Sequence, residues 1–222
     1  LKNALKNDLV GDQFYKFILK NLYNHSNMVN IKNIAEFLDI EVDHNSEMNN
    51  YPWWAEVKPW DNLTFKQKLV NYPQQVKNNR MENGFYINVE NSFEIMKCDY
   101  ENSLPSHAKQ YSRLTELIKK NGFQCGGEYG YVNAELFVKE NELYWKTGGE
   151  GNHRAIVAAA LNLEKLPVII TKIIRLNELK HWPNVVNGLF TEEQANKIFN
   201  SIFNAKPAKI HSNWIRKVKN KI

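Results

Sequence analysis

The chain has 222 residues, of which 43% are hydrophobic, 12% aromatic and 24% charged. This composition excludes an intrinsically disordered chain, because disorder requires few apolar and aromatic residues. No apolar run reaches the roughly 18 residues that a membrane-spanning helix needs, so we expect no membrane partner. No signal peptide is visible at the start of the sequence, and we expect a cytoplasmic protein.

The formal net charge of +5 permits a polyanionic partner without requiring one. Lysines are scattered along the chain until a basic tail at residues 206–222. This tail is a candidate contact for DNA, although basic tails are more often solvated chain ends. Arginine, the side chain that clamps phosphate through two hydrogen bonds, is scarce. Its positions are Arg80, Arg113, Arg154, Arg175 and Arg216.

The two cysteines, Cys98 and Cys125, do not form a CxxC pair. Two cysteines cannot hold a structural zinc ion by themselves. We expect reduced thiols, with a single disulfide in a secreted protein as the alternative.

Residues 1 to about 40 have apolar side chains at helical spacing, which predicts helices there. Residues 29–40 resemble the first helix of a helix-turn-helix motif. The acidic, turn-like residues 41–50 that follow do not resemble a recognition helix, so plain helical packing is favoured over DNA reading.

Residues 41–62 read as a loop that contains Trp53, Trp54 and Trp60. Such a cluster most often anchors a loop to the core, and the alternative is a platform that stacks on a base or another ligand. A helix capped by Thr64 is expected over residues 63–82, with an interruption at Pro73.

From residue 84 the pattern changes to alternating strands and helices, which places a domain boundary there. The predicted elements are strands at 84–89 and 93–97, a loop containing Pro105, a helix through Tyr111 to Asn121, a hairpin turning at Glu140-Asn141, a helix at 155–161, a strand at 168–174 and a helix at 192–203. The domains predicted from this pattern are a helical, Trp-rich region at 1–83, an α+β domain with a small mixed sheet at 84–180, and a helical extension with the basic tail at 181–222.

The segment from Trp145 to Ala155 has the clearest chemical character. A strand is followed by the glycines of Gly148-Gly149-Glu150-Gly151 and then by a helix. Glycines let backbone N–H groups approach an anion, and a helix start adds partial positive charge. Asn152 is a natural N-cap, and His153 and Arg154 fall in the first helical turn. The residues therefore suit a phosphate group, while an ordinary tight turn explains them equally well.

Residues 111–170 resemble the ParB/sulfiredoxin superfamily. The resemblance lies in the order of helix, hairpin, turn, helix, proline and strand, and in Gly151-Asn-His-Arg154 at the place of that family's Gly-x-x-Arg turn. It implies a ParB/sulfiredoxin-like fold that binds a nucleotide, commonly with Mg²⁺. Asn152 stands where sulfiredoxins carry their nucleophile, so reductase chemistry is not expected.

The resemblance implies phosphoryl transfer or nucleotide hydrolysis at this turn. The candidate residues for nucleotide or phosphate binding are Gly149, Glu150, Gly151, Asn152, His153, Arg154, Arg113 and His107. Of these, the resemblance assigns Gly151 to backbone approach and His153 and Arg154 to phosphate. Candidate catalytic residues are His153, Arg154 and Glu101, and Glu150 is the candidate Mg²⁺ ligand. The alternatives are a DNA-binding protein or ParB-like nuclease, and a non-catalytic module that binds a protein through the Trp-rich segment.

Overall fold

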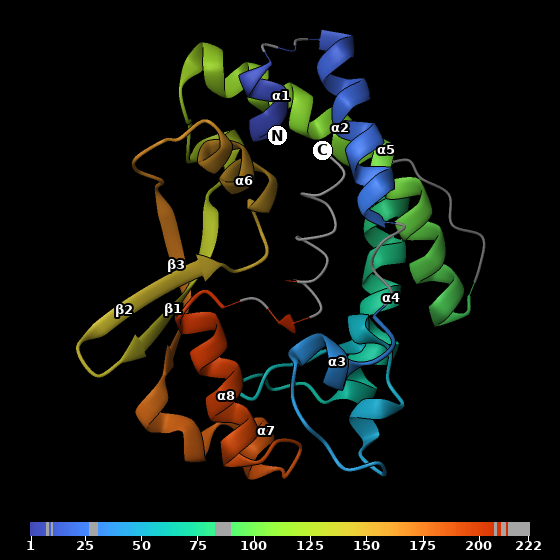
Figure 1. Cartoon of the computed structure of the whole chain (residues 1–222), viewed down its shortest axis with the longest axis vertical. Coiled ribbons are helices and arrows are strands. Elements are labelled where there is room, and N and C mark those ends of the chain that lie inside the picture. The colour runs from blue at the N-terminus through green and yellow to red at the C-terminus, as the bar shows by residue number, and fades with distance from the viewer. Residues whose placement is uncertain are drawn as a thin grey trace. The chain divides into compact units, whose positions relative to one another are not determined.

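A computed structural model describes residues 1–7, 9, 11–26, 31–82, 90–206, 208, 209 and 212, with the backbone alone for 23–26, 82, 97–102 and 128. The chain divides into two compact units. Figure 1 labels the helices and strands of which they consist. Unit 1 combines Leu1–Asn27 with Asn102–Ile174, and unit 2 combines Met28–Glu101 with Arg175–Ile222. The boundary predicted near residue 84 lies outside the described residues, and each unit takes segments from both sides of it.

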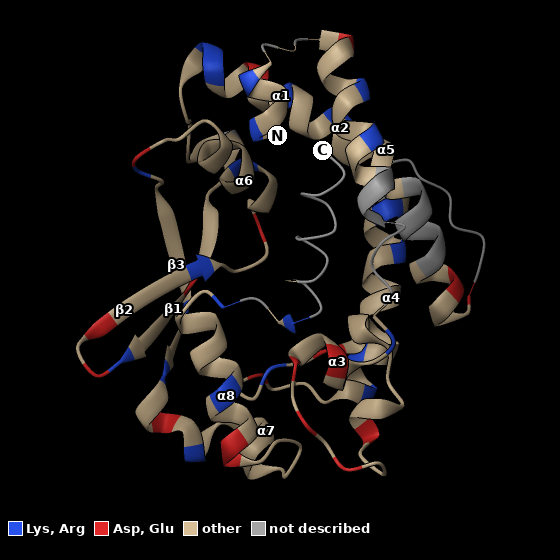
Figure 2. Cartoon of the chain, viewed as in Figure 1, with Lys and Arg blue, Asp and Glu red and all other residues tan. Residues whose placement is uncertain are grey.

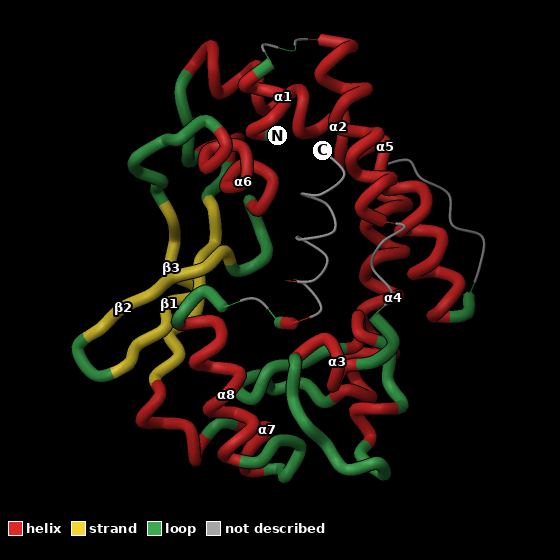
Figure 3. The backbone as a smooth tube through the Cα atoms, viewed as in Figure 1, coloured by secondary structure: helices red, strands yellow, loops and turns green. Residues whose placement is uncertain are grey.

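Unit 1 contains a small sheet with helices, which confirms the α+β class and the small sheet. Figure 3 shows its three strands, β1 (Val132–Lys139), β2 (Glu142–Thr147) and β3 (Val168–Arg175), in the order β2-β1-β3. β1 and β2 are antiparallel, with Leu136 opposite Trp145. The turn predicted at Glu140-Asn141 is confirmed, and Glu140 adopts a positive φ of 52° there.

The helices of unit 1 are α1 (Lys2–Lys6), α2 (Gly11–Ser26), α6 (Asn152–Ala160) and the later part of α5 (Ser92–Asn121). Buried Ala4, Phe14, Ile18 and Ala108 form one apolar cluster, which joins α1 and α2 to α5. The N-terminal helices therefore share a core with the C-terminal part of α5 and do not form a separate helical region.

Unit 2 contains α3 (Ile34–Leu38), α4 (Phe65–Glu82), the first part of α5, α7 (Pro183–Val186) and α8 (Glu192–Phe203), together with short 3₁₀ turns at Glu47–Asn49, Trp53–Ala55 and Leu176–His181. Aromatic rings fill its core: Trp60 meets Trp182 edge-on at 5.1 Å, and Phe65 meets Phe190 at 5.7 Å between ring centroids. The capping box of Thr191 and Gln194 at the start of α8 is confirmed.

Asn184 explains how the Trp-rich loop is held in unit 2. The Asn184 side chain is 1% exposed, and its amide donates to the backbone carbonyls of Lys58 and Leu63, each at 3.0 Å. Trp60 is 5% exposed, which confirms it as a core anchor. Trp53, which is 37% exposed, lies 5.7 Å from Phe37 between ring centroids.

Two predicted elements in the middle of the chain are wrong. Residues 93–97 are not a strand and Pro105 is not in a loop, because both lie within α5. The side chain of Asn91 accepts from the N–H of Phe93 at 2.9 Å and so caps the start of this helix. Alternating apolar residues had suggested a strand, but Ile95 is buried while Phe93 is 56% exposed. The strand predicted at 84–89 lies outside the described residues.

The interruption predicted at Pro73 is also wrong, because α4 continues through it. The side chain of Gln67 accepts from the N–H of Thr64, and the hydroxyl of Thr64 accepts from the N–H of Gln67, so the predicted cap is confirmed. Pro73 is fully buried. A proline in a helix interior removes one backbone hydrogen bond, and burial of the Pro73 ring offsets part of the stability that is lost with it.

Among the helices that the structure describes, none combines the length and the apolar character needed to cross a bilayer. Cys125 is an exposed free thiol, and the side chain of Cys98 lies outside the described residues.

Candidate functional site

Backbone hydrogen bonds hold the glycine turn of residues 148–151 against the start of β1. The N–H of Gly148 donates to the carbonyl of Asn133 at 2.8 Å, and the N–H of Asn133 donates to the carbonyl of Glu150 at 3.1 Å. The Asn133 side chain also donates to Oε2 of Glu150 at 3.0 Å. These bonds fix the path by which the chain leaves β2 and enters α6.

Gly151 is the residue that this path requires to be glycine. Its φ is +76°, and a Cβ atom there would lie 2.8 Å from Cα of Val132 and 3.1 Å from the carbonyl oxygen of Tyr131. Both contacts are with backbone atoms that cannot move aside easily. The turn therefore brings the start of α6 directly against β1.

Asn152 does not cap α6 as predicted. Gly151 is the N-cap in a left-handed conformation, and Asn152 is the first helical residue. Its side chain therefore points elsewhere, and its Oδ1 atom is buried with no hydrogen-bond partner among the described residues. A buried acceptor of this kind is satisfied when a donor reaches it.

His107 and His153, predicted site residues 46 positions apart in the sequence, are in direct contact. His107 Nδ1 lies 2.8 Å from His153 Nε2. The ring centroids are 4.9 Å apart, with 24° between the ring planes. The ring planes are therefore close to parallel, and in a hydrogen bond between these two nitrogens one donates while the other accepts.

His107 lies in α5 and not in a loop as predicted, and Tyr111 follows it one helical turn later. The ring centroid of Tyr111 is 5.0 Å from that of His153. Burial raises the pKa of the Tyr111 phenol above its usual range, so the hydroxyl stays protonated at neutral pH. Tyr111 is not among the predicted site residues, although its i, i+4 spacing from His107 is a signal that could have found it.

The guanidinium of Arg154 is hydrogen-bonded to the glycine-rich loop of residues 122–131. Its guanidinium donates to the carbonyls of Gln124, Tyr129 and Gly130, the last at 3.3 Å. It also lies over the ring of Phe123, with 4.6 Å from Cζ to the ring centroid. Neutral carbonyls do not cancel its positive charge, so Arg154 holds this loop and keeps the start of α6 electropositive.

Glu150 is exposed and is held by Asn133 through one carboxylate oxygen. The described residues contain no group of three or more His, Cys, Asp or Glu side chains arranged to hold a metal ion. Mg²⁺ often binds to one or two carboxylates while phosphates and waters supply its other ligands. Glu150 supplies one carboxylate, and the described residues do not form a complete protein cage for a metal ion.

The other predicted residues are placed as follows. Gly149 has a φ of +118° and open space around it. Arg113 is exposed on α5, and two positions along a helix correspond to about 200° of rotation, so it points away from the face that carries Tyr111. Glu101 belongs to α5, but its side chain lies outside the described residues. Most of the basic tail is also outside them.

No protein-family model matches this sequence, and no curated protein or solved structure matches it significantly.

Proposed function

We propose that unit 1 binds a nucleotide by its phosphates at the turn of residues 148–153, and that the histidine pair moves a proton during phosphoryl transfer or nucleotide hydrolysis. The observation that carries this proposal is the 2.8 Å contact between His107 Nδ1 and His153 Nε2 at the start of α6. The ParB/sulfiredoxin resemblance supports the same site from the Gly-Asn-His-Arg motif.

The start of α6 supports binding of an anion. N–H groups in the first turn of a helix point outward along its axis, and the helix dipole places partial positive charge there. Arg154 adds a full charge that no carboxylate among the described residues neutralises. Gly151 carries no side chain, so the backbone at the start of α6 packs directly against β1 and is fixed in place.

The histidine pair supports acid–base chemistry next to this anion. A hydroxyl or water oxygen attacks the terminal phosphorus, and the bond from that phosphorus to its bridging oxygen breaks. The proton of the attacking group passes to the histidine pair, and a proton returns to the leaving group. Two imidazoles in direct contact can accept one proton and donate another, which suits this exchange. A bound Mg²⁺ would be held by Glu150 and the phosphates, and it would neutralise charge on the transferring group.

A panel of nucleotides with and without Mg²⁺, measured by thermal shift and calorimetry, tests this proposal. A ligand present at about 100 times its Kd stabilises the folded state by about 2.7 kcal/mol, so the melting temperature should rise. We expect His153→Gln to weaken binding, and His107→Gln to lower kcat by about a hundredfold or more with a smaller change in KM.

His181→Gln provides the matched control, because His181 is an exposed histidine in unit 2. We expect it to leave nucleotide binding and turnover unchanged. If no nucleotide raises the melting temperature of the wild-type protein, or if His181→Gln has the same effect as His153→Gln, the proposal is wrong.

A further inference from the structure

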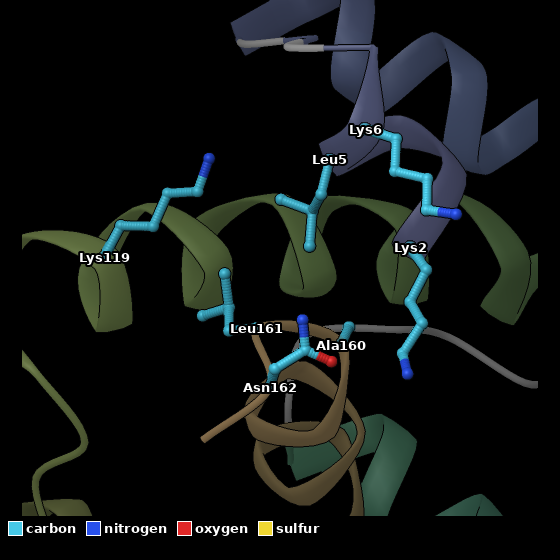
Figure 4. Close-up of a pocket in the computed structure, with 7 residues that line it drawn as sticks. All are labelled: Lys2, Leu5, Lys6, Lys119, Ala160, Leu161 and Asn162. Carbon is cyan, nitrogen blue, oxygen red and sulfur yellow. The ribbon is translucent and has the colours of Figure 1, made fainter. Parts of the chain in front are cut away.

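A second candidate ligand site lies in unit 1 at the other end of α6. Figure 4 shows a pocket of about 460 Å³ between α1, the last turns of α5 and the chain that leaves α6. Its volume falls within the range of small-molecule pockets. The residues that line it are Lys2, Leu5, Lys6, Lys119, Ala160, Leu161 and Asn162.

Among the residues that the structure describes, the charged side chains that line this pocket are Lys2, Lys6 and Lys119, and all three are positive. Within the described residues, none of these three ammonium groups has an ion pair or a hydrogen bond. Lys2 and Lys6 are four residues apart in α1, so they share one side of that helix and repel each other unless an anion lies between them. Figure 2 shows lysines on α1 and at the end of α5 in blue.

The arrangement of the lysines limits the shape of the ligand. In Figure 4, Lys119 stands on one side of the pocket while Lys2 and Lys6 stand on the other. Leu5 and Leu161 lie between these two sides, and the amide of Asn162 is placed beside them. A molecule with a phosphate at each end and a less polar middle contacts the lysines on both sides and the leucines between them.

We propose that this pocket binds a small organic molecule that carries two phosphate groups, one held by Lys119 and the other by Lys2 and Lys6. The site is separate from the glycine turn, because it lies at the C-terminal end of α6 and shares none of the residues of that turn. Multivalent anions gain most from such a set of separated ammonium groups, because each ion pair alone contributes little at an exposed surface.

Calorimetry with fructose 1,6-bisphosphate, compared with fructose 6-phosphate as the monophosphate probe, tests this inference. We expect the bisphosphate to bind more tightly, and its affinity to fall steeply as the salt concentration increases. The triple substitution Lys2→Gln, Lys6→Gln and Lys119→Gln should weaken binding of the bisphosphate by about tenfold or more. All three lysines are exposed, so the melting temperature should stay close to that of the wild type.

Lys120→Gln is the matched control, because Lys120 is an exposed neighbour of Lys119 that does not line the pocket. It should leave bisphosphate binding unchanged. Equal affinities for the two probes, or an equal loss in Lys120→Gln and the triple variant, would overturn the inference.

His153→Gln separates this inference from the proposed function. Bisphosphate binding should survive that substitution, since His153 does not line the pocket. If His153→Gln abolishes bisphosphate binding while the triple lysine variant keeps it, the bisphosphate binds at the glycine turn. That result would reject the lysine pocket and leave the proposed function standing.

Discussion

At the scale of single residues, Gly151 must be glycine for two reasons, its backbone conformation and its close approach to β1. Its φ of +76° disfavours any residue with a Cβ, and that Cβ would also lie 2.8 Å from Cα of Val132. We expect Gly151→Ala to lower the free energy of unfolding by about 2 kcal/mol or more, because backbone strain and overpacking add together. Urea unfolding followed by circular dichroism measures this change.

Gly122 offers the comparison for Gly151. Its φ is +71°, but a Cβ there would meet nothing within 4 Å. Gly122→Ala should therefore cost only the strain, about 1 kcal/mol. Equal losses in the two variants would show that the close approach of α6 to β1 does not constrain this turn.

Tyr111 gives a prediction about pH at the same scale. Its pKa is raised by burial, so the folded state keeps the phenol proton to higher pH than the unfolded state does. This stabilisation is complete below the unfolded pKa of about 10 and is lost as the pH rises through the folded value. Between about pH 9 and about pH 11, the free energy of unfolding should fall less in Tyr111→Phe than in the wild type.

Other groups that titrate in this range contribute equally to both proteins. The difference between the two proteins in how steeply the free energy of unfolding falls with pH therefore isolates Tyr111. Urea unfolding at the two pH values measures the free energy of unfolding of each protein. If that free energy falls equally in the wild type and in Tyr111→Phe, a buried, protonated Tyr111 beside the histidine pair is contradicted.

At the scale of elements, the two prolines inside long helices make contrasting predictions. Pro105 is partly buried in α5, whereas Pro73 is fully buried in α4. Pro105→Ala restores a helical hydrogen bond with little loss of packing, and should raise the free energy of unfolding by about 1 to 3 kcal/mol. Pro73→Ala should raise the free energy of unfolding by less, because removal of the buried ring also leaves a cavity. Denaturant unfolding curves of both variants test this order, and a larger gain for Pro73→Ala would contradict it.

Elements with their own start and stop signals were predictable from sequence. The box of Thr191 and Gln194 marks α8, and Gly122 ends α5 where its N–H donates to the carbonyl of Ile118 at 3.0 Å. The first half of α5 was not predictable in this way, since a short alternation of apolar residues fits either a strand or one side of a helix. Its helical form depends on burial of Ile95, which is a property of the folded unit.

At the scale of the whole molecule, the charge of +5 and the basic tail allow a prediction about DNA. If the tail binds DNA, the logarithm of the affinity should fall linearly with the logarithm of the salt concentration, with a slope of about −0.9 for each phosphate contacted. Replacing Arg216, Lys217, Lys219 and Lys221 with glutamine should then flatten that slope. Fluorescence anisotropy with a short duplex measures it, and an unchanged slope would exclude the tail as the contact.

The division into units also belongs to this scale. A boundary drawn along the sequence assumes that neighbouring segments fold together. In the structure, the first two helices pack with Ala108 of α5 in unit 1, and Asn184 binds the carbonyls of Lys58 and Leu63 in unit 2. These contacts join segments that are distant in the sequence, and no local pattern of residues predicts them.

The α+β class, the hairpin, the glycine turn that begins α6 and the candidate residues His107 and His153 are all predictable from the sequence. These features depend on local signals, namely spacing, turn chemistry and residue type. The contact between the two histidines, the hold of Arg154 on the 122–131 loop and the place of Tyr111 beside His153 appear only in the folded chain. The physical reason is that such contacts join residues far apart in the chain, and packing brings them within hydrogen-bond distance only once the unit has folded.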